Sequence, residues 1–132
     1  MRPLRRLPPL LALLALLAPV AVRAAPWTID PAHAFVTFRV SHLGFSDVHG
    51  RFREFDAEID FDPEDVESAS VVFRVQAASV DTAWPARDRH LRSADFLDAE
   101  AHPEIVFVSD RVRLTSAETA QIEGEFTLRG ET

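Results

Sequence analysis

Five histidines and many carboxylates are the residues of this sequence whose types could support catalysis or metal binding. The histidines are His33, His42, His49, His90 and His102. Their spacing matches no His-Glu-x-x-His motif, and the chain has neither a Gly-x-Ser-x-Gly motif nor a phosphate-binding glycine loop. It has no Cys and no Lys, which excludes thiol nucleophiles, disulfides and Schiff-base chemistry. We therefore expect a protein that is not an enzyme and holds no cofactor. A metal site built by His42, His49 and a carboxylate is the alternative.

Charge is divided unevenly between the start of the chain and the rest. The chain has 132 residues and a net charge of −7. Residues 1–24 contain four of the 14 arginines and no acid, so residues 25–132 hold 10 Arg against 21 Asp and Glu. Because an acidic surface is repelled by nucleic acid and by anionic headgroups, we expect no basic groove for either.

The first 24 residues are typical of an export signal. Arg2, Arg5 and Arg6 precede an apolar run over residues 10–22, which is too short to cross a bilayer as a helix. Small or aliphatic residues end this run, and we predict cleavage after Ala24. Residues 1–24 are thus a predicted signal peptide, and residues 25–132 a predicted periplasmic domain. A retained membrane anchor is the alternative.

Alternation of apolar and polar residues predicts that the domain is all-β. In residues 36–40 and 55–61 every second residue is apolar, which is typical of a strand buried on one face. Phe52 is out of phase with the second series, so we expect a bulge or bend near Arg53 and Glu54 in one long strand that begins near Val48. Further strands are predicted over residues 27–29, 70–79, 104–114 and 121–129.

One stretch interrupts the alternation and predicts a short helical insertion around residues 85–98. Pro85 suits the first position of a helix, and Asp88 and Arg92 lie four residues apart, on one helical face. We expect two turns, capped by Ser93 or Asp95. Three apolar side chains would then plug one end of the sheet: Leu91, Phe96 and Leu97.

Four segments of the sequence resemble the YceI-like family of polyisoprenoid-binding proteins. They read WTIDPAH over residues 27–33, VSHLGF followed by VHGRF over residues 40–52, HLRSADFLD over residues 90–98, and HPEIVF over residues 102–107. The resemblance covers residues 26–130. It implies an exported, lipocalin-like antiparallel β-barrel whose apolar lumen holds an isoprenoid or a similar amphiphile, such as a quinone or prenyl phosphate.

The sequence departs from that family at its carboxyl end. In the family, the segment like residues 124–130 is followed by further strands that complete the barrel, whereas here two residues follow. About six strands leave an open edge, and a small barrel needs about eight to close. We therefore expect a C-terminally truncated, incomplete barrel, or one completed by another chain, for example in a homodimer.

A polyprenyl tail forms no hydrogen bonds, so its site needs only an apolar tunnel. Ordinary core packing is the alternative for each apolar residue that faces inward. The residues predicted to line the lumen are Val36, Phe38, Val40, Phe55, Ile59, Phe61, Phe73, Val75, Ile105, Phe107 and Phe126.

The matched motifs put forward four polar residues for a ligand headgroup: His42, Arg89, Arg92 and Asp95. An arginine can bind a phosphate with two hydrogen bonds. Ion pairs of Arg92 with Asp88 and of Arg89 with Glu100 are the alternative.

The expected function is non-catalytic binding of a long-chain isoprenoid or a similar lipid, such as a polyprenyl phosphate, quinone or fatty amide. Its partners would be that lipid and a membrane redox or lipid-delivery protein, with no nucleic acid. The alternative is a stress-related module that binds another protein through the open edge of its sheet.

Overall fold

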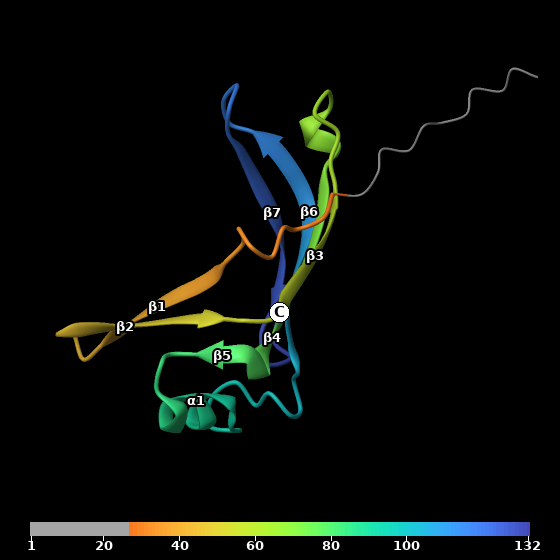
Figure 1. Ribbon diagram of the computed structural model, residues 1–132. Coiled ribbons are helices and arrows are strands. Elements are labelled where there is room, and N and C mark those ends of the chain that lie inside the picture. Colours follow the sequence, from red (N-terminus) through yellow and green to blue (C-terminus); the bar gives the residue numbers. More distant parts are fainter. Residues whose placement is uncertain (1–26) are drawn as a thin grey trace, which may run out of the picture.

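The computed structural model describes residues 27–132, so the predicted signal peptide and its cleavage site lie outside the described residues. The described chain forms two antiparallel sheets, which do not close into a barrel (Figure 1). One sheet has the strand order β1-β2-β5 and the other β3-β4-β6-β7. An antiparallel, mostly β fold with one short helix is thereby confirmed.

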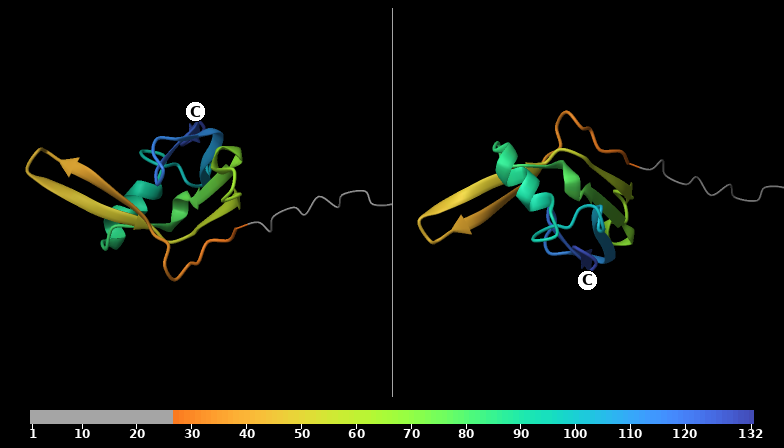
Figure 2. Two further views of the ribbon diagram at one scale, coloured as in Figure 1. Left: turned by 90° about the horizontal axis from the view of Figure 1, so that it is seen from above. Right: turned by 90° about the horizontal axis from the view of Figure 1, so that it is seen from below.

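The first sheet is mainly a long hairpin. Its strands are β1 (Val36–His42), β2 (Ser46–Phe52) and the two-residue β5 (Val80–Asp81). Val36 lies opposite Phe52, Phe38 opposite Gly50 and Val40 opposite Val48. Residues directly opposite each other point to the same side of a sheet, so the alternation in the sequence gives the hairpin one apolar face. Figure 2 shows that the hairpin projects away from the other sheet.

The second sheet forms the body of the molecule. Its strands are β3 (Phe55–Asp60), β4 (Ser70–Gln76), β6 (Glu104–Leu114) and β7 (Ala120–Thr127). A 3-10 helix, η1 (Val66–Ser68), precedes β4. The strand predicted over residues 27–29 is reduced to one bridge, between Trp27 and Ile59. The strand predicted to reach residue 129 ends at Thr127, because Leu128 and Glu131 pair in a tight turn.

The predicted bend at Arg53 and Glu54 is where the chain leaves one sheet and enters the other. Neither residue has a partner in the strand registers, and a second 3-10 helix, η2 (Ala77–Ser79), accepts from their backbone N–H groups, while Glu54 O accepts from Gln76 N of β4. Arg53 N donates to Ser79 O at 3.2 Å, and Glu54 N donates to Ser79 Oγ at 3.1 Å. The single long strand expected from the sequence is therefore two strands, one in each sheet.

A small core joins the sheets on either side of this bend. It is built around four buried residues: Val75, Ala77, Ala99 and Ile105. Two residues of the hairpin, Val36 and Phe52, pack against this core together with Phe55 and Phe73 of the body.

A β-bulge changes the face of β6 part-way along its length. The pairing with β7 slips between Ser109 and Arg111, so that Ser109 lies opposite Gly124 while Val112 lies opposite Ile122. Without the extra residue, Val112 would share the outer face with Val108. The bulge brings it to the inner face, where it is 5% exposed.

The predicted helix is α1 (Pro85–Arg92), with Pro85 in its first turn. Ser93 ends it, and both its backbone N and its Oγ donate to His90 O. Leu91 and Leu97 are half-buried, but Phe96 is 48% exposed and lies edge-on to the His90 ring. Phe96 therefore does not plug the sheet as predicted. Among residues 27–132, no helix has the length and hydropathy to cross a membrane.

Candidate ligand-binding site

The inner face of the second sheet presents apolar side chains in rows that cross its strands. One row runs through Ala57, Phe73, Phe107 and Phe126, which lie opposite one another in β3, β4, β6 and β7. A second row joins three further residues on the same face: Phe55, Val75 and Ile105. All the residues that the sequence predicted to line a lumen from these four strands share this face.

The rows are buried to very different extents. Val75 is 4% exposed and Ile105 8%, so both are packed core at the end of the sheet nearest α1. Phe107 and Phe73 are half-buried. Phe126 is 54% exposed. Exposure of the inner face therefore rises across the sheet, from buried Ala57 in β3 to Phe126 in the edge strand β7, and we call this face the trough.

Three of the predicted residues from β1 continue the apolar surface on the hairpin. Val36 packs against the core, and the Phe38 ring lies over Gly50 and 5.5 Å from the Phe52 ring. Val40 lies nearer the end of the hairpin and is 57% exposed. The eleventh predicted residue, Phe61, follows β3 at the sheet edge, where its ring contacts Trp27 edge-on and its carbonyl accepts from Trp27 Nε1.

A half-open cavity of about 580 Å³, with both apolar and charged walls, lies where the hairpin meets the body. It is bounded by the segment before β1 and by the bend between β2 and β3. Its charged lining comes from Arg51, Arg53, Glu54 and Asp56. Its apolar lining comes from Ile29, Pro31, Ala34, Phe35, Val36, Phe52 and Phe55. This volume falls within the range of small-molecule sites in proteins.

A second cavity, of about 520 Å³, adjoins the first because Arg53 and Glu54 line both. Its walls come from η2, β5 and α1, and they carry Arg89 and Arg92, two of the four predicted headgroup residues. His42 and Asp95 do not line it. His42 ends β1 in the hairpin, and Asp95 accepts from His90 at 3.1 Å.

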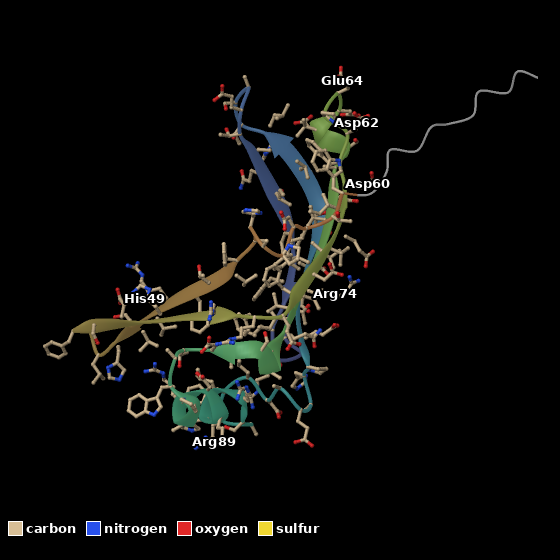
Figure 3. The ribbon with its side chains drawn as sticks, in the orientation of Figure 1. His49, Asp60, Asp62, Glu64, Arg74 and Arg89 are labelled. Atoms are coloured by element: carbon tan, nitrogen blue, oxygen red, sulfur yellow. The ribbon has the colours of Figure 1, made fainter. Side chains whose placement is uncertain are left out.

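The two arginines of this cavity have different roles. Arg92 donates from Nε to Ala78 O at 2.6 Å and from Nη2 to Val80 O at 2.9 Å, which ties α1 to the first sheet. Arg89 is exposed and forms no hydrogen bond or ion pair within residues 27–132. Figure 3 shows Arg89 on α1 and His49 on the hairpin above it.

The ion pairs weighed for these arginines are not formed. Asp88, the expected partner of Arg92, is 6% exposed and accepts from both Thr82 N and Thr82 Oγ1, at 2.9 and 2.6 Å. Asp88 therefore closes the turn before α1, whereas its four-residue spacing from Arg92 had suggested an ion pair. Arg89 likewise has no ion pair with Glu100 in the described residues.

Sequence reasoning missed an ion-pair cluster on Asp81. Its Oδ2 accepts from Arg51 Nε at 3.1 Å and from Arg53 Nη2 at 2.7 Å. The hydrogen bond from Ala83 N and those from the two arginines lower the pKa of Asp81 to about 2. Arg51 and Arg53 flank Phe52 and alternate with it, which was the only local signal. Their partner lies some 30 residues away, where the sequence gives no sign of the pairing.

No group of three or more His, Asp or Glu side chains in residues 27–132 is arranged to hold a metal ion. His42 and His49, the histidines weighed for such a site, both lie on the exposed hairpin.

Two antiparallel sheets, one of them with an apolar inner face, and one short helix make up a lipocalin-like fold. Residues 27–132 match the YceI-like domain, and the chain belongs to the YceI-like family. That family is not a known family of enzymes. The resemblance noted in the sequence is confirmed.

Individual relatives agree with this assignment. A UPF0312 protein of Vibrio cholerae is 40% identical over 86% of this chain and 61% of its own length. A UPF0312 protein of Ectopseudomonas mendocina is 44% identical over 83% of this chain and 58% of its own length. The chain thus spans about three fifths of these relatives.

Solved structures give the same fold. The Campylobacter jejuni YceI protein is similar with a TM-score of 0.62 and 35% identity, over 79% of this chain and 61% of its own. BcnA of Burkholderia cenocepacia is similar with a TM-score of 0.72 and 25% identity, over 77% of this chain and 64% of its own.

Proposed function

We propose that this protein binds a long-chain isoprenoid, or a similar amphiphilic lipid, without chemically altering it. The observation that carries the proposal is the apolar inner face, whose rows run from a packed core to exposed Phe126. Flexible apolar chains need a continuous surface rather than directional contacts, and each Å² removed from water contributes about 25 cal/mol. The half-open cavity of about 580 Å³ at the junction of the sheets adds further apolar surface beside charged side chains.

The polar end of the lipid would lie in the adjoining arginine-lined cavity. Arg53 borders both cavities, and Arg89 has its guanidinium free of partners in residues 27–132. An arginine of this kind suits a phosphate, to which it can form two charge-assisted hydrogen bonds. In this proposal Arg92 orients the helix that carries Arg89, because its own donors are engaged by backbone carbonyls.

The proposal also places the protein in the periplasm, as the basic and apolar start of the sequence predicts. There it would exchange its lipid with a membrane or with a membrane redox or delivery protein. A homodimer is compatible with this role, and binding of an extended peptide at the sheet edge is the competing function.

Two substitutions on opposite faces of one strand pair test the lipid site. Phe126 faces the trough and Val108 faces away from it, and both are substantially exposed, at 54% and 41%. We expect Phe126→Ser to weaken binding of a defined polyprenyl phosphate and of a quinone, as followed by native mass spectrometry. Val108→Ser is the matched control and should bind both lipids as the parent does.

The headgroup is tested separately with Arg89→Ala. This variant should lose affinity for the polyprenyl phosphate and retain it for the neutral quinone. Equal binding by all three variants and the parent, or organic extracts of exported protein that contain no lipid, would contradict the proposed function.

A further inference from the structure

The end of the β1–β2 hairpin exposes large apolar side chains. We define the hairpin tip as residues 40–45. Within it Val40 is 57% exposed, Leu43 80% and Phe45 94%. The tip extends away from both the core and α1 (Figures 1 and 2). Neighbouring apolar side chains that protrude in this way mark an interaction surface in soluble proteins.

The backbone of the tip shows that Leu43 is not there to stabilise the turn. Leu43 and Gly44 both have positive φ, at 56° and 73°, and Phe45 N donates to His42 O at 3.1 Å. His42 pairs with Ser46, so residues 43–45 form a three-residue loop. Positive φ suits glycine and asparagine, and a leucine is strained there. Three other non-glycine residues of 27–132 have positive φ, namely Ala83, Asp98 and Arg129. Leu43 differs from them in its large, 80% exposed apolar side chain, and we interpret it as a contact residue on that ground.

The charge of the hairpin differs from that of the rest of the molecule. Residues 36–52 contain Arg39, Arg51, His42 and His49, and only one acid, Asp47. Arg51, at the base of the hairpin, pairs with Asp81 of β5, so Arg39 is the arginine nearer the tip. The remainder of the described chain has 8 Arg against 20 acidic residues. Arg39 pairs with Asp47 at 3.4 Å, but both side chains are exposed, so solvent screens the pair and it can rearrange. The hairpin would therefore face an anionic surface while the acidic body turns away from it.

We propose that the hairpin tip docks on an anionic phospholipid bilayer. Leu43 and Phe45 enter the interfacial region, where aromatic and aliphatic side chains are favoured, and Arg39 lies at the level of the phosphates. Two side chains and a few cations give reversible attachment rather than permanent anchoring. This inference goes beyond lipid carriage and does not depend on it, because docking requires no molecule in the trough.

Vesicle flotation tests the proposal with the exported form of the protein, its N-terminus verified by mass. The vesicles contain phosphatidylethanolamine with phosphatidylglycerol as the minor component. The test variant is L43N combined with F45S. Losing two side chains that are buried in the interface should lower the partition coefficient about tenfold or more. The fold should be retained, because asparagine adopts the positive φ of position 43 more readily than leucine, and Phe45 has almost no contacts to lose.

The matched control is L114N, which makes the same change at an exposed apolar residue at the far end of β6. It should float with vesicles as the parent does. R39Q should reduce flotation in low salt and have little effect in high salt. High salt already screens the attraction between Arg39 and the lipid phosphates.

The proposal would be overturned if the parent protein did not float with the vesicles, or if the double variant floated equally well. It would also be overturned if no form bound vesicles and the parent formed a dimer that the double variant did not form. The last result would assign the tip to a second copy of this chain. Native mass spectrometry of lipid binding by the double variant tests the two proposals independently. The variant should still take up quinone, so either proposal can fail without the other.

Discussion

Gly124 lies at the bulge where β6 and β7 change register, and its replacement by alanine should destabilise the body of the protein. A Cβ atom built on Gly124 would lie 2.2 Å from Val108 O and 2.8 Å from Ser109 Cα. Both are backbone atoms of the neighbouring strand, so they can move only if the strand pair moves. Gly50 offers a comparison, because its Cβ would also meet an atom at 2.2 Å, the Cζ of the Phe38 ring.

The two substitutions should differ in cost because the obstacles differ. Overpacking against a backbone costs about 1–3 kcal/mol, and the lower entropy of the unfolded alanine chain returns about 0.4–1 kcal/mol. For Gly124→Ala we expect a net loss of about 1–2 kcal/mol. At about 4–8 °C per kcal/mol, the melting temperature should fall by about 5–15 °C. At Gly50 the Phe38 ring can rotate away from the new Cβ atom at a cost of about 0.5–1.5 kcal/mol. The lower entropy of the unfolded alanine chain offsets much of this cost.

Urea unfolding followed by far-UV circular dichroism measures both free energies under the same conditions. Gly124→Ala should unfold at a clearly lower urea concentration than Gly50→Ala, with an unchanged dependence on urea. Equal midpoints for the two variants, or a Gly50→Ala variant that is the less stable of the two, would refute the close strand approach at the bulge.

Three further predictions concern the ion pairs, the helix and the core. Asp81 has its pKa lowered from 3.8 to about 2, so its ionised form stabilises the fold at neutral pH and this contribution is lost as the pH falls from about 4 to about 2. Asp81→Asn should therefore lower the urea midpoint at pH 7, and the difference from the parent should shrink as the pH falls from about 4 to about 2. The control Glu118→Gln, in the turn between β6 and β7, should show no such trend. Arg92→Ala should cost about 1–3 kcal/mol, because two carbonyls lose a charged donor, while Arg89→Ala should stay within about 0.5 kcal/mol of the parent in thermal unfolding. Ile105→Ala should cost about 2–4 kcal/mol in urea unfolding, because the residue is 8% exposed and its loss leaves a cavity in the small core.

Local patterns in the sequence predicted the strands and the helix well. Alternation at Phe55 and Ile59 assigned the inner face, because side chains of a strand point to opposite sides in turn. Pro85 marked the start of α1, because proline suits the first turn and interrupts the preceding strand. These features depend on near neighbours in the chain, which is why they can be read without knowing the fold.

Features that depend on distant partners could not be predicted. The bend at Arg53 was expected, but the change of sheet depends on hydrogen bonds that Arg53 N and Glu54 N donate to η2, more than 20 residues later. Arg92 was weighed against Asp88 on its own helix, whereas its carbonyl partners belong to η2 and β5. The bulge after Ser109 depends on the approach of Gly124 from β7. In each case the deciding contact joins segments whose spacing in sequence carries no periodic signal.

The small core at the bend makes the hairpin a lever. Only Val36 and Phe52 tie the hairpin's apolar face to the packed core, while the seven residues of β1, from Val36 to His42, span about 23 Å at ~3.3 Å per residue. By that length, a rotation of about 10° at the core moves the tip by about 4 Å. A small change in the packing of Phe52 therefore displaces Leu43 and Phe45 more than any residue nearer the core. The mechanical coupling runs in both directions, so a force on the tip acts on the residues that wall the half-open cavity.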